Sequence, residues 1–214
     1  MTGHAHEPES STEAGQETGR RDAQLLQEAI HKSVSASPEA FLTTVTDVEA
    51  TSIDYWEEEI ASSTWVVIER GEEVVGIAVA RQPRHDKDQD VDPNTARFIE
   101  SVWIDPGLRG SGISERLMKF LFEVECEKNP EVRQFMLWVF DGNGHAIRLY
   151  ERMGFKDTTL RNVDTGGGWT ERKYQLTLDT DAMKAAEKEE NEDARREDLR
   201  QSGVTYRVLG GNSE

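Results

Sequence analysis

The amino-acid sequence predicts an α/β domain, because runs typical of strands alternate with runs typical of helices. Residues 65–70 and 73–80 are two strand-like runs, and Gly71-Glu72 between them predicts a hairpin turn. Residues 98–104 form a third such run, followed by the turn signal Asp105-Pro106-Gly107. The segment beyond the turn is predicted to be an amphipathic helix, since its apolar residues recur on one face.

Toward the N-terminus, the composition predicts a tail followed by short helices. Residues 1–20 are predicted to be a disordered acidic tail, because they are rich in Glu, Ser, Thr and Gly and contain almost nothing to bury. A helix is predicted to begin at Asp22, a candidate cap. Pro38 opens a further helical turn, and residues 48–61 are predicted to form one more helix before the first strand.

The second half of the chain predicts three more strands and a helix. Residues 133–140 form an apolar strand, and Asp141 or Asn143 caps the helix that follows. Residues 155–164 and 169–178 are predicted to be the final strands of the sheet, with a glycine-rich loop between them.

Beyond residue 179 the composition changes again. Residues 180–214 are predicted to be a charged, helical C-terminal extension, because Glu, Lys, Arg and Ala dominate its first two thirds. The short segment 204–209 alternates like a strand. It can add to a sheet edge in its own subunit or in a partner, and the sequence leaves both arrangements open.

The segment between the third strand and its helix is rich in glycine. Its residues are Arg109, Gly110, Ser111, Gly112, Ile113 and Ser114. A glycine-rich turn from a strand into a helix points several backbone N–H groups at one spot, and the helix N-terminus adds roughly half a positive charge. The sequence therefore predicts an anion site, suited to a pyrophosphate.

Two motifs connect this chain to a known family. The pattern Arg109-x-x-Gly112-x-Ser114 resembles the acyl-CoA pyrophosphate loop of the GNAT N-acetyltransferase superfamily, which includes bacterial members. The family usually has Gly or Ala at the last position, and Ser114 is small and keeps its N–H. The segment with Asn143, Ala146 and Tyr150 resembles the second conserved block of the family. The resemblance covers residues 21–179, which are predicted to form the acetyltransferase domain.

The resemblance implies a fold and a reaction. The fold is a mixed, mostly antiparallel twisted sheet with helices on both faces. The reaction transfers an acetyl group from acetyl-CoA, the acyl-donor cosubstrate, to a primary amine by direct attack in a ternary complex. The backbone of Val102, Trp103 and Ile104 would pair with the pantetheine arm, where this strand splays from residues 133–140. Further cofactor contacts are implied for the loop 109–114 and for Asn143, Ala146 and Tyr150.

Tyr150 is the best candidate for a catalytic residue, because it matches the family tyrosine that protonates the departing thiolate. A phenol with a pKa near 10 is protonated at neutral pH and suits this role. The alternative is a tyrosine that only packs.

Glu100 is the candidate base or substrate-orienting group. Period-two alternation places its side chain on the same strand face as Val102 and Ile104. The alternative is a carboxylate that pairs with a nearby Arg or Lys.

Composition excludes several other classes. The chain has 25 basic and 42 acidic residues and a net charge of −17, which argues against binding nucleic acid or an anionic membrane surface. An acidic surface can steer a cationic amine toward the protein, and the alternative is that the whole proteome of the source is acidic. No apolar run has the length of a membrane span. The single cysteine, Cys126, fits a reducing cytoplasm, and the histidines have no metal-ligand spacing. His145 is predicted to be a solvent-exposed residue.

The sequence leaves alternatives open on function. A non-catalytic acyl-CoA-binding module would have the same loop, with Tyr150 and Glu100 only packing or pairing. An unrelated nucleotide-binding domain needs a lysine or an acidic ribose partner that does not follow Gly110–Gly112. The acceptor is a small-molecule or peptide amine whose identity the sequence does not specify. A homodimer, which is common in this family, is also an open option.

Overall fold

The computed structural model describes residues 9–84, 88, 91–164, 168–177 and 203–210. In this part of the chain, one sheet has the strand order β5-β6-β4-β3-β2-β1-β7. Neighbouring strands are antiparallel except β3 and β4, which are parallel. The strands are β1 (Ser63–Arg70), β2 (Glu73–Arg81), β3 (Ala96–Ile104), β4 (Gln134–Phe140), β5 (Lys156–Asp164), β6 (Trp169–Thr177) and β7 (Thr205–Val208). The predicted mixed, mostly antiparallel sheet is therefore confirmed.

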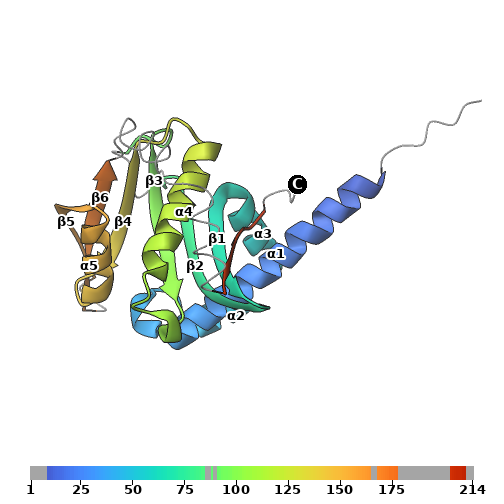
Figure 1. Cartoon of the computed structure of the whole chain (residues 1–214), viewed down its shortest axis with the longest axis horizontal. Helices are drawn as coiled ribbons and strands as arrows, with labels where there is room; N and C mark the ends of the chain where they lie inside the picture. Colours follow the sequence, from blue (N-terminus) through green and yellow to red (C-terminus); the bar gives the residue numbers. More distant parts are fainter. Residues whose placement is uncertain (1–8, 85–87, 89–90, 165–167, 178–202, 211–214) are drawn as a thin grey trace, which may run out of the picture.

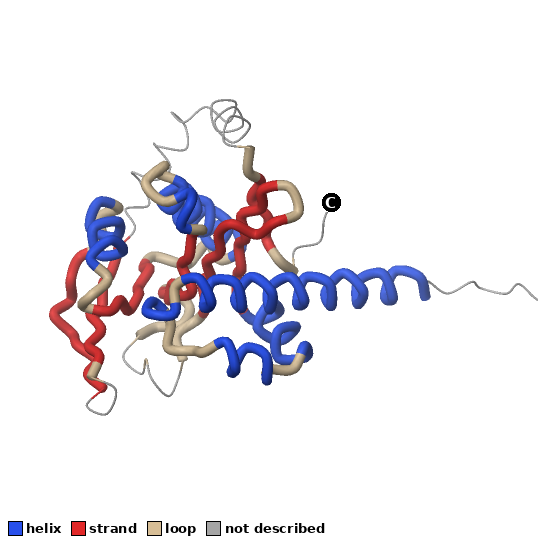
Figure 2. Tube along the Cα trace, turned by 90° about the horizontal axis from the view of Figure 1, so that it is seen from below, coloured by secondary structure: helices blue, strands red, loops and turns tan. Residues whose placement is uncertain are grey.

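Helices cover both faces of the sheet, as predicted. Helices α4 and α5 lie on one face, and α1, α2 and α3 lie on the other (Figures 1 and 2). Each layer buries its own apolar cluster, with Leu117 and Phe135 on the α4 side and Leu26 and Ile77 on the α1 side. The helices are α1 (Glu9–Ala36), α2 (Val45–Ala50), α3 (Ile53–Ser62), α4 (Ile113–Lys128) and α5 (Gly144–Arg152), and the short 3-10 turns are η1 (Pro38–Ala40) and η2 (Pro106–Leu108).

Helix α1 begins earlier than the sequence suggests. It starts at Glu9 instead of Asp22, so helix extends into the segment 1–20 that was predicted to be disordered. The first turns project away from the sheet (Figure 2). Gln16, Glu17 and Thr18 carry exposed polar side chains, whereas Asp22, Ala23 and Leu26 are buried. Burial therefore begins near the predicted start, and the polar turns before it continue the helix. Residues 1–8 lie outside the described residues.

The single helix predicted over residues 48–61 is wrong, because the structure has two. Thr44 caps α2 with a reciprocal capping box to Asp47. Ser52 then caps α3 by accepting a hydrogen bond from the N–H of Tyr55. Ser and Thr compete for nearby backbone groups in this way, which favours caps over helix interiors. Thr51 and Ser52 are therefore the sequence signal for the end of one helix and the start of a second.

The C-terminal strand β7 pairs with β1 of its own chain. This settles which of the two arrangements left open for residues 204–209 is present. Leu209 is 1 % exposed, and the carboxylate of Asp22 accepts a hydrogen bond from the N–H of Gly210 at 3.0 Å. The predicted helix over residues 181–201 lies outside the described residues.

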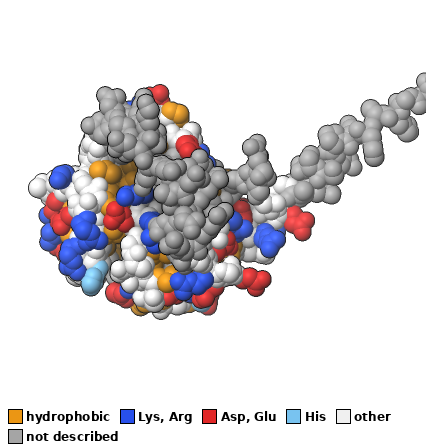
Figure 3. Space-filling view, viewed as in Figure 1, with side chains coloured by type: hydrophobic (Ala, Val, Ile, Leu, Met, Phe, Trp, Pro, Cys, Tyr) orange, Lys and Arg blue, Asp and Glu red, His pale blue; other side chains and the backbone are white. Residues whose placement is uncertain are grey.

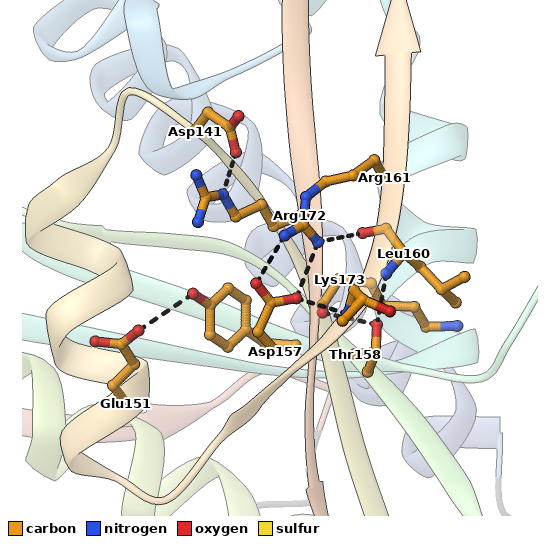
Figure 4. Close-up of polar contacts among 10 residues, drawn as sticks. Asp141, Glu151, Asp157, Thr158, Leu160, Arg161, Arg172 and Lys173 are labelled. Carbon is orange, nitrogen blue, oxygen red and sulfur yellow. Dashed lines mark hydrogen bonds and ion pairs between the residues drawn. The ribbon is translucent and has the colours of Figure 1, made fainter.

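The opposite edge of the sheet, strand β5, carries mostly exposed side chains. Ion pairs hold this edge, between Arg161 and Asp157 at 2.8 Å and between Arg172 and Asp141 (Figure 4). The hydroxyl of Tyr174 on β6 donates to Glu151 on α5 at 3.3 Å. This hydrogen bond connects α5 to β6, near the edge of the sheet.

Candidate active site

The glycine-rich segment forms an open turn at the start of α4. Gly110 and Gly112 both have φ of +80°, and Gly112 is the N-cap residue of α4. No atom lies within 4 Å of a Cβ built on either glycine, so the positive φ, and not a lack of space, calls for glycine. Positive φ values in such a turn aim successive N–H groups into one concavity. The positive φ values at both glycines are compatible with the turn that the predicted anion site needs.

A cavity of about 970 Å³ lies between this turn, the end of β3 and helix α5. This volume is at the upper end of the range typical of small-molecule sites. Most of the predicted cofactor-binding residues line it, namely Val102, Trp103, Ile104, Arg109, Gly110, Gly112, Ser114, Asn143, Ala146 and Tyr150. Two do not line it. Ser111 donates its hydroxyl to the carbonyl of Leu108 at 2.7 Å, and the side chain of Ile113 is buried in the apolar cluster under α4.

Strands β3 and β4 separate where the cavity opens. Their parallel pairing covers only Ala96, Arg97 and Phe98, matched with residues 134–136. Beyond Phe98 the two strands share no further register, and the cavity is lined by the last residues of both. The splay that the family resemblance implied is present, and it leaves the backbone of Val102–Ile104 without a strand partner on the β4 side.

Tyr150 lies on α5 and lines the cavity, although the residue is only 6 % exposed. Burial raises the pKa of its phenol well above the ordinary value. Its ring packs against Phe155 with centroids 5.7 Å apart. The hydroxyl is thus fully protonated at any physiological pH, as an acid for a thiolate needs to be.

Asn143 has the cap that the sequence predicts. Its Oδ1 accepts a hydrogen bond from the N–H of Ala146 at 3.2 Å, and it is the N-cap residue of α5. It also lines the cavity. The same residue can therefore begin the helix and contact a ligand.

The Arg109 side chain contacts its own chain. Its Nε donates to the carbonyl of Ile104 at 3.1 Å, and its Nη2 donates to the hydroxyl of Ser37 at 2.8 Å. Ser37 is buried at the end of α1 and lines the same cavity. Arg109 therefore ties the anion turn to the α1 layer.

The predicted face of Glu100 is wrong. Ser101 has φ of +53°, and the β2–β3 register shifts between Ile77 and Val79, so a bulge interrupts the alternation. In the β2–β3 register Glu100 lies opposite Val79, which belongs to the α1-side cluster, so its side chain is on the α1 side. Val102 and Ile104 pack on the α4 side. The carboxylate of Glu100 forms ion pairs with Arg81 and, at 3.6 Å, with Arg84. The paired carboxylate considered as an alternative is what the geometry shows.

Two residues near Glu100 have no signal in the sequence. Tyr55 on α3 has a pKa raised by burial, by Glu59 and by the negative charge of Glu100. Glu171 on β6 has a pKa raised by burial and by the same charge, against the hydrogen bond from Asn162 that lowers it. These groups come from three distant elements. Glu100 and Glu171 thus place two carboxylates on the α1-side face, next to Arg81 and Arg84.

Two classes of feature are absent from the described part of the chain. No group of three or more His, Cys, Asp or Glu residues there is arranged to hold a metal ion. Among the same residues, no helix is both long and apolar enough to cross a bilayer.

Comparisons with known proteins agree on one family. The model of the acetyltransferase (GNAT) family matches residues 24–155. The chain is 36 % identical over 62 residues to thialysine N-epsilon-acetyltransferase of Sus scrofa, covering 29 % of this chain and 35 % of that protein. It is 31 % identical over 74 residues to spermine/spermidine N(1)-acetyltransferase of Bacillus subtilis (strain 168), covering 35 % and 46 %. The matches thus span less than half the length of these curated relatives.

Solved structures share the fold over most of the chain. The protein yncA of Salmonella typhimurium, solved with its cofactor acetyl-CoA, has a TM-score of 0.57 at 21 % identity, over 75 % of this chain and 90 % of that one. Ribosomal-protein-alanine N-acetyltransferase of Brucella melitensis has a TM-score of 0.57 at 22 % identity, over 74 % and 96 %.

Proposed function

The chain belongs to the GNAT acetyltransferase family, and from that premise we propose that it transfers an acetyl group from acetyl-CoA to a primary amine by direct attack in a ternary complex. One observation carries the proposal. A single cavity joins the anion turn, the unpaired edge of β3 and the buried phenol of Tyr150. These are the three parts that a thioester donor with a pyrophosphate at its far end requires.

The donor is proposed to lie along this cavity. The N–H groups of the turn 109–114 would hold the pyrophosphate at the N-terminus of α4. The pantetheine amides would pair with the free backbone of Val102, Trp103 and Ile104, as an added strand does. The structurally similar Salmonella protein that holds acetyl-CoA supports this choice of donor.

The transfer step needs two proton movements. The neutral amine attacks the thioester carbonyl carbon, the C–N bond forms and the C–S bond breaks. The attacking nitrogen loses one proton to Glu100 or to water, the departing thiolate of CoA gains one, and the group that donates to the thiolate is reprotonated from solvent. Tyr150 is proposed to supply the second proton, because its buried phenol is neutral and lies on the cavity wall. A backbone N–H of β3 would stabilise the developing oxyanion.

The acceptor is proposed to approach from the α1-side face of the splay. An alkyl amine has a pKa near 10 and arrives as a cation. Glu100 and Glu171 face that side and attract it. Glu100 is still proposed as the base or substrate-orienting group, a role in which the amine would have to replace Arg81 or Arg84 as its partner. The matched relatives that acetylate thialysine or spermine support small aliphatic amines as the class to test.

Calorimetry with acetyl-CoA, followed by a thiol-release assay with spermidine and with thialysine, tests the proposal. We expect saturable one-to-one binding that Gly112→Asp abolishes, because the new carboxylate would enter the anion turn. We also expect CoA release that depends on the amine. Binding without release with either amine would favour a non-catalytic acyl-CoA-binding module, and no binding at millimolar acetyl-CoA would refute both.

A further inference from the structure

A third apolar cluster lies on the α1-side face of the sheet. Its buried members are Ala96, Phe98 and Met136, with Val91 and Trp138 packed against them. Figure 2 shows α1, α2 and α3 lying along the other part of the sheet, and none of them lies beside β5 and β6. This group, called the Phe98 cluster below, borders the splay, because the β3–β4 pairing ends at Phe98 and Met136.

Lys173 on β6 is buried against the Phe98 cluster. The next residue, Tyr174, packs in the α4-side cluster, so strand alternation places the Lys173 side chain on the α1 side. Its Nζ lies 5.1 Å from the ring centroid of Phe98 and 5.8 Å from that of Trp138. Trp138 is also the partner of Lys173 in the β4–β6 register. The residue is 9 % exposed, so its ammonium group is held against two aromatic rings beside the splay.

The ammonium group of Lys173 has no carboxylate partner among the residues that the structure describes. Lys32, which is more exposed, pairs with Glu73. On the face shown in Figure 3, Lys and Arg side chains also lie among Asp and Glu side chains. Burying a cation without a counter-ion costs free energy, and contacts with aromatic rings offset only part of that cost. In a chain with 42 acidic residues, this unpaired cation favours a ligand that brings its own anionic group.

The other cation of the Phe98 cluster is neutralised within the chain. The guanidinium group of Arg81 lies 5.0 Å from the ring centroid of Phe98. It forms ion pairs with Glu100 and, at 3.6 Å, with Asp88. Two cations therefore contact one ring, and the described carboxylates neutralise only Arg81.

Carboxylates lie at a short distance from Lys173 on the same face. Glu171 precedes it by two residues on β6, so both side chains point to the α1 side. A strand rises about 3.3 Å per residue, which separates the two positions by about 7 Å. Burial and the nearby charge of Glu100 raise the pKa of Glu171, so these two carboxylates lie near each other. The face therefore presents acidic groups and one unpaired ammonium group side by side.

We propose that the acceptor amine also carries a carboxylate, which Lys173 binds, an inference that rests on the proposed function. Glu171 and Glu100 would attract the ammonium group of the acceptor, and Nζ of Lys173 would donate hydrogen bonds to its carboxylate. The spacing of about 7 Å suits an amino acid whose reacting amine stands several carbons from the carboxylate. A polyamine would instead bring a further cation toward Lys173 and be repelled.

Two acceptors of equal length that differ in charge test this subsite, 6-aminohexanoate and its amide, 6-aminohexanamide. CoA release from the full chain at saturating acetyl-CoA gives kcat and KM for each acceptor. We expect kcat/KM to be about 10- to 100-fold higher for the carboxylate, the range of a hydrogen bond to a charged group. The difference should lie mainly in KM, because Lys173 binds the acceptor and takes no part in the proton transfers.

Variants of Lys173 assign the preference to its charge. Lys173→Met keeps an apolar side chain of similar length and should abolish the preference by raising KM for 6-aminohexanoate, with little change for the amide. Lys173→Arg should keep part of it. Lys128→Met, which changes an exposed lysine at the end of α4, is the matched control and should keep all of it. Thermal unfolding of each variant shows whether the fold is retained.

The remaining outcomes are distinct. Equal kcat/KM for the two acceptors, or a preference for the amide or for spermidine, overturns the carboxylate subsite and leaves the proposed function intact. A Lys173→Met variant that loses activity equally with both acceptors would assign Lys173 to packing and also overturn it. A chain that releases no CoA with any of these amines, or with thialysine, refutes the proposed function and this inference with it.

Discussion

At the scale of single residues, burial gives Tyr150 its chemical character. The phenol lies on the cavity wall with a pKa raised by burial, and its ring packs against Phe155. A packing role and an acid role are therefore both compatible with its surroundings. Only the loss of the hydroxyl, with the ring retained, separates them.

Tyr150→Phe is expected to lower kcat by about 10²- to 10⁴-fold, because the leaving thiolate loses its proton donor. The Kd for acetyl-CoA, measured by calorimetry, should change little. In the wild-type protein, ionisation of Tyr150 should cause no loss of activity below about pH 10, since burial raises its pKa. An unchanged kcat would show that Tyr150 only packs.

Arg97 and Glu125 form an ion pair at 2.5 Å with side chains 5 % and 2 % exposed. Glu125 also accepts a hydrogen bond from Asn129 at 2.7 Å. Glu125→Gln or Arg97→Met leaves a buried charge without its partner, and we expect a loss of about 3–5 kcal/mol in the free energy of unfolding by urea. Lys119→Ala, which breaks an exposed pair, should cost less than about 0.5 kcal/mol. A similarly small loss for both pairs would contradict the view that the buried Arg97–Glu125 pair is needed for stability.

At the scale of elements, the bulge in β3 and the choice of β1 as the partner of β7 are the features that alternation does not predict. The bulge at Ser101 moves Glu100 to the face opposite Val102. Strand β7 closes the β1 edge, which would otherwise present unpaired N–H and C=O groups. The bulge places Glu100 on the α1 side of the sheet, and the pairing of β7 brings Leu209 into the α1-side cluster.

Leu209→Ala, just beyond β7, is expected to destabilise the fold by about 2–5 kcal/mol, because Leu209 is 1 % exposed in the α1-side cluster. Leu160→Ala on the opposite edge is the matched control. Leu160 is 54 % exposed, so its loss should stay within about 0.5 kcal/mol. Thermal or urea unfolding measures both, and equal effects would mean that β7 does not anchor the domain.

At the scale of the whole molecule, the splayed sheet separates two helix layers that would both take part in the proposed reaction. The cofactor turn belongs to the α4 layer, and the acidic groups Glu100 and Glu171 face the α1 layer. Arg109 connects the layers through the hydroxyl of Ser37 and the carbonyl of Ile104. One wall of the cavity therefore depends on a contact between residues far apart in the chain.

A double-mutant cycle tests this connection. Arg109→Ala and Ser37→Ala should each weaken acetyl-CoA binding, and their effects should be non-additive by about 0.5–1.5 kcal/mol. Ser35→Ala is the control, because its hydroxyl donates to His31 within α1 and its effect should add to that of Arg109→Ala. Additive effects for Ser37 as well would show that Arg109 does not act through it.

The sequence by itself determined most of the element types, the strands of the sheet, the glycine-rich turn before α4 and the helix that carries Tyr150, because periodicity, caps and glycine positions are local features of neighbouring residues. It also identified the family. Only the tertiary structure decided the face of Glu100, the contacts of Arg109, the approach of Glu171 and the pairing of β7 with β1. Each of these depends on residues far apart in the chain, whose meeting follows from packing and register and leaves no local pattern.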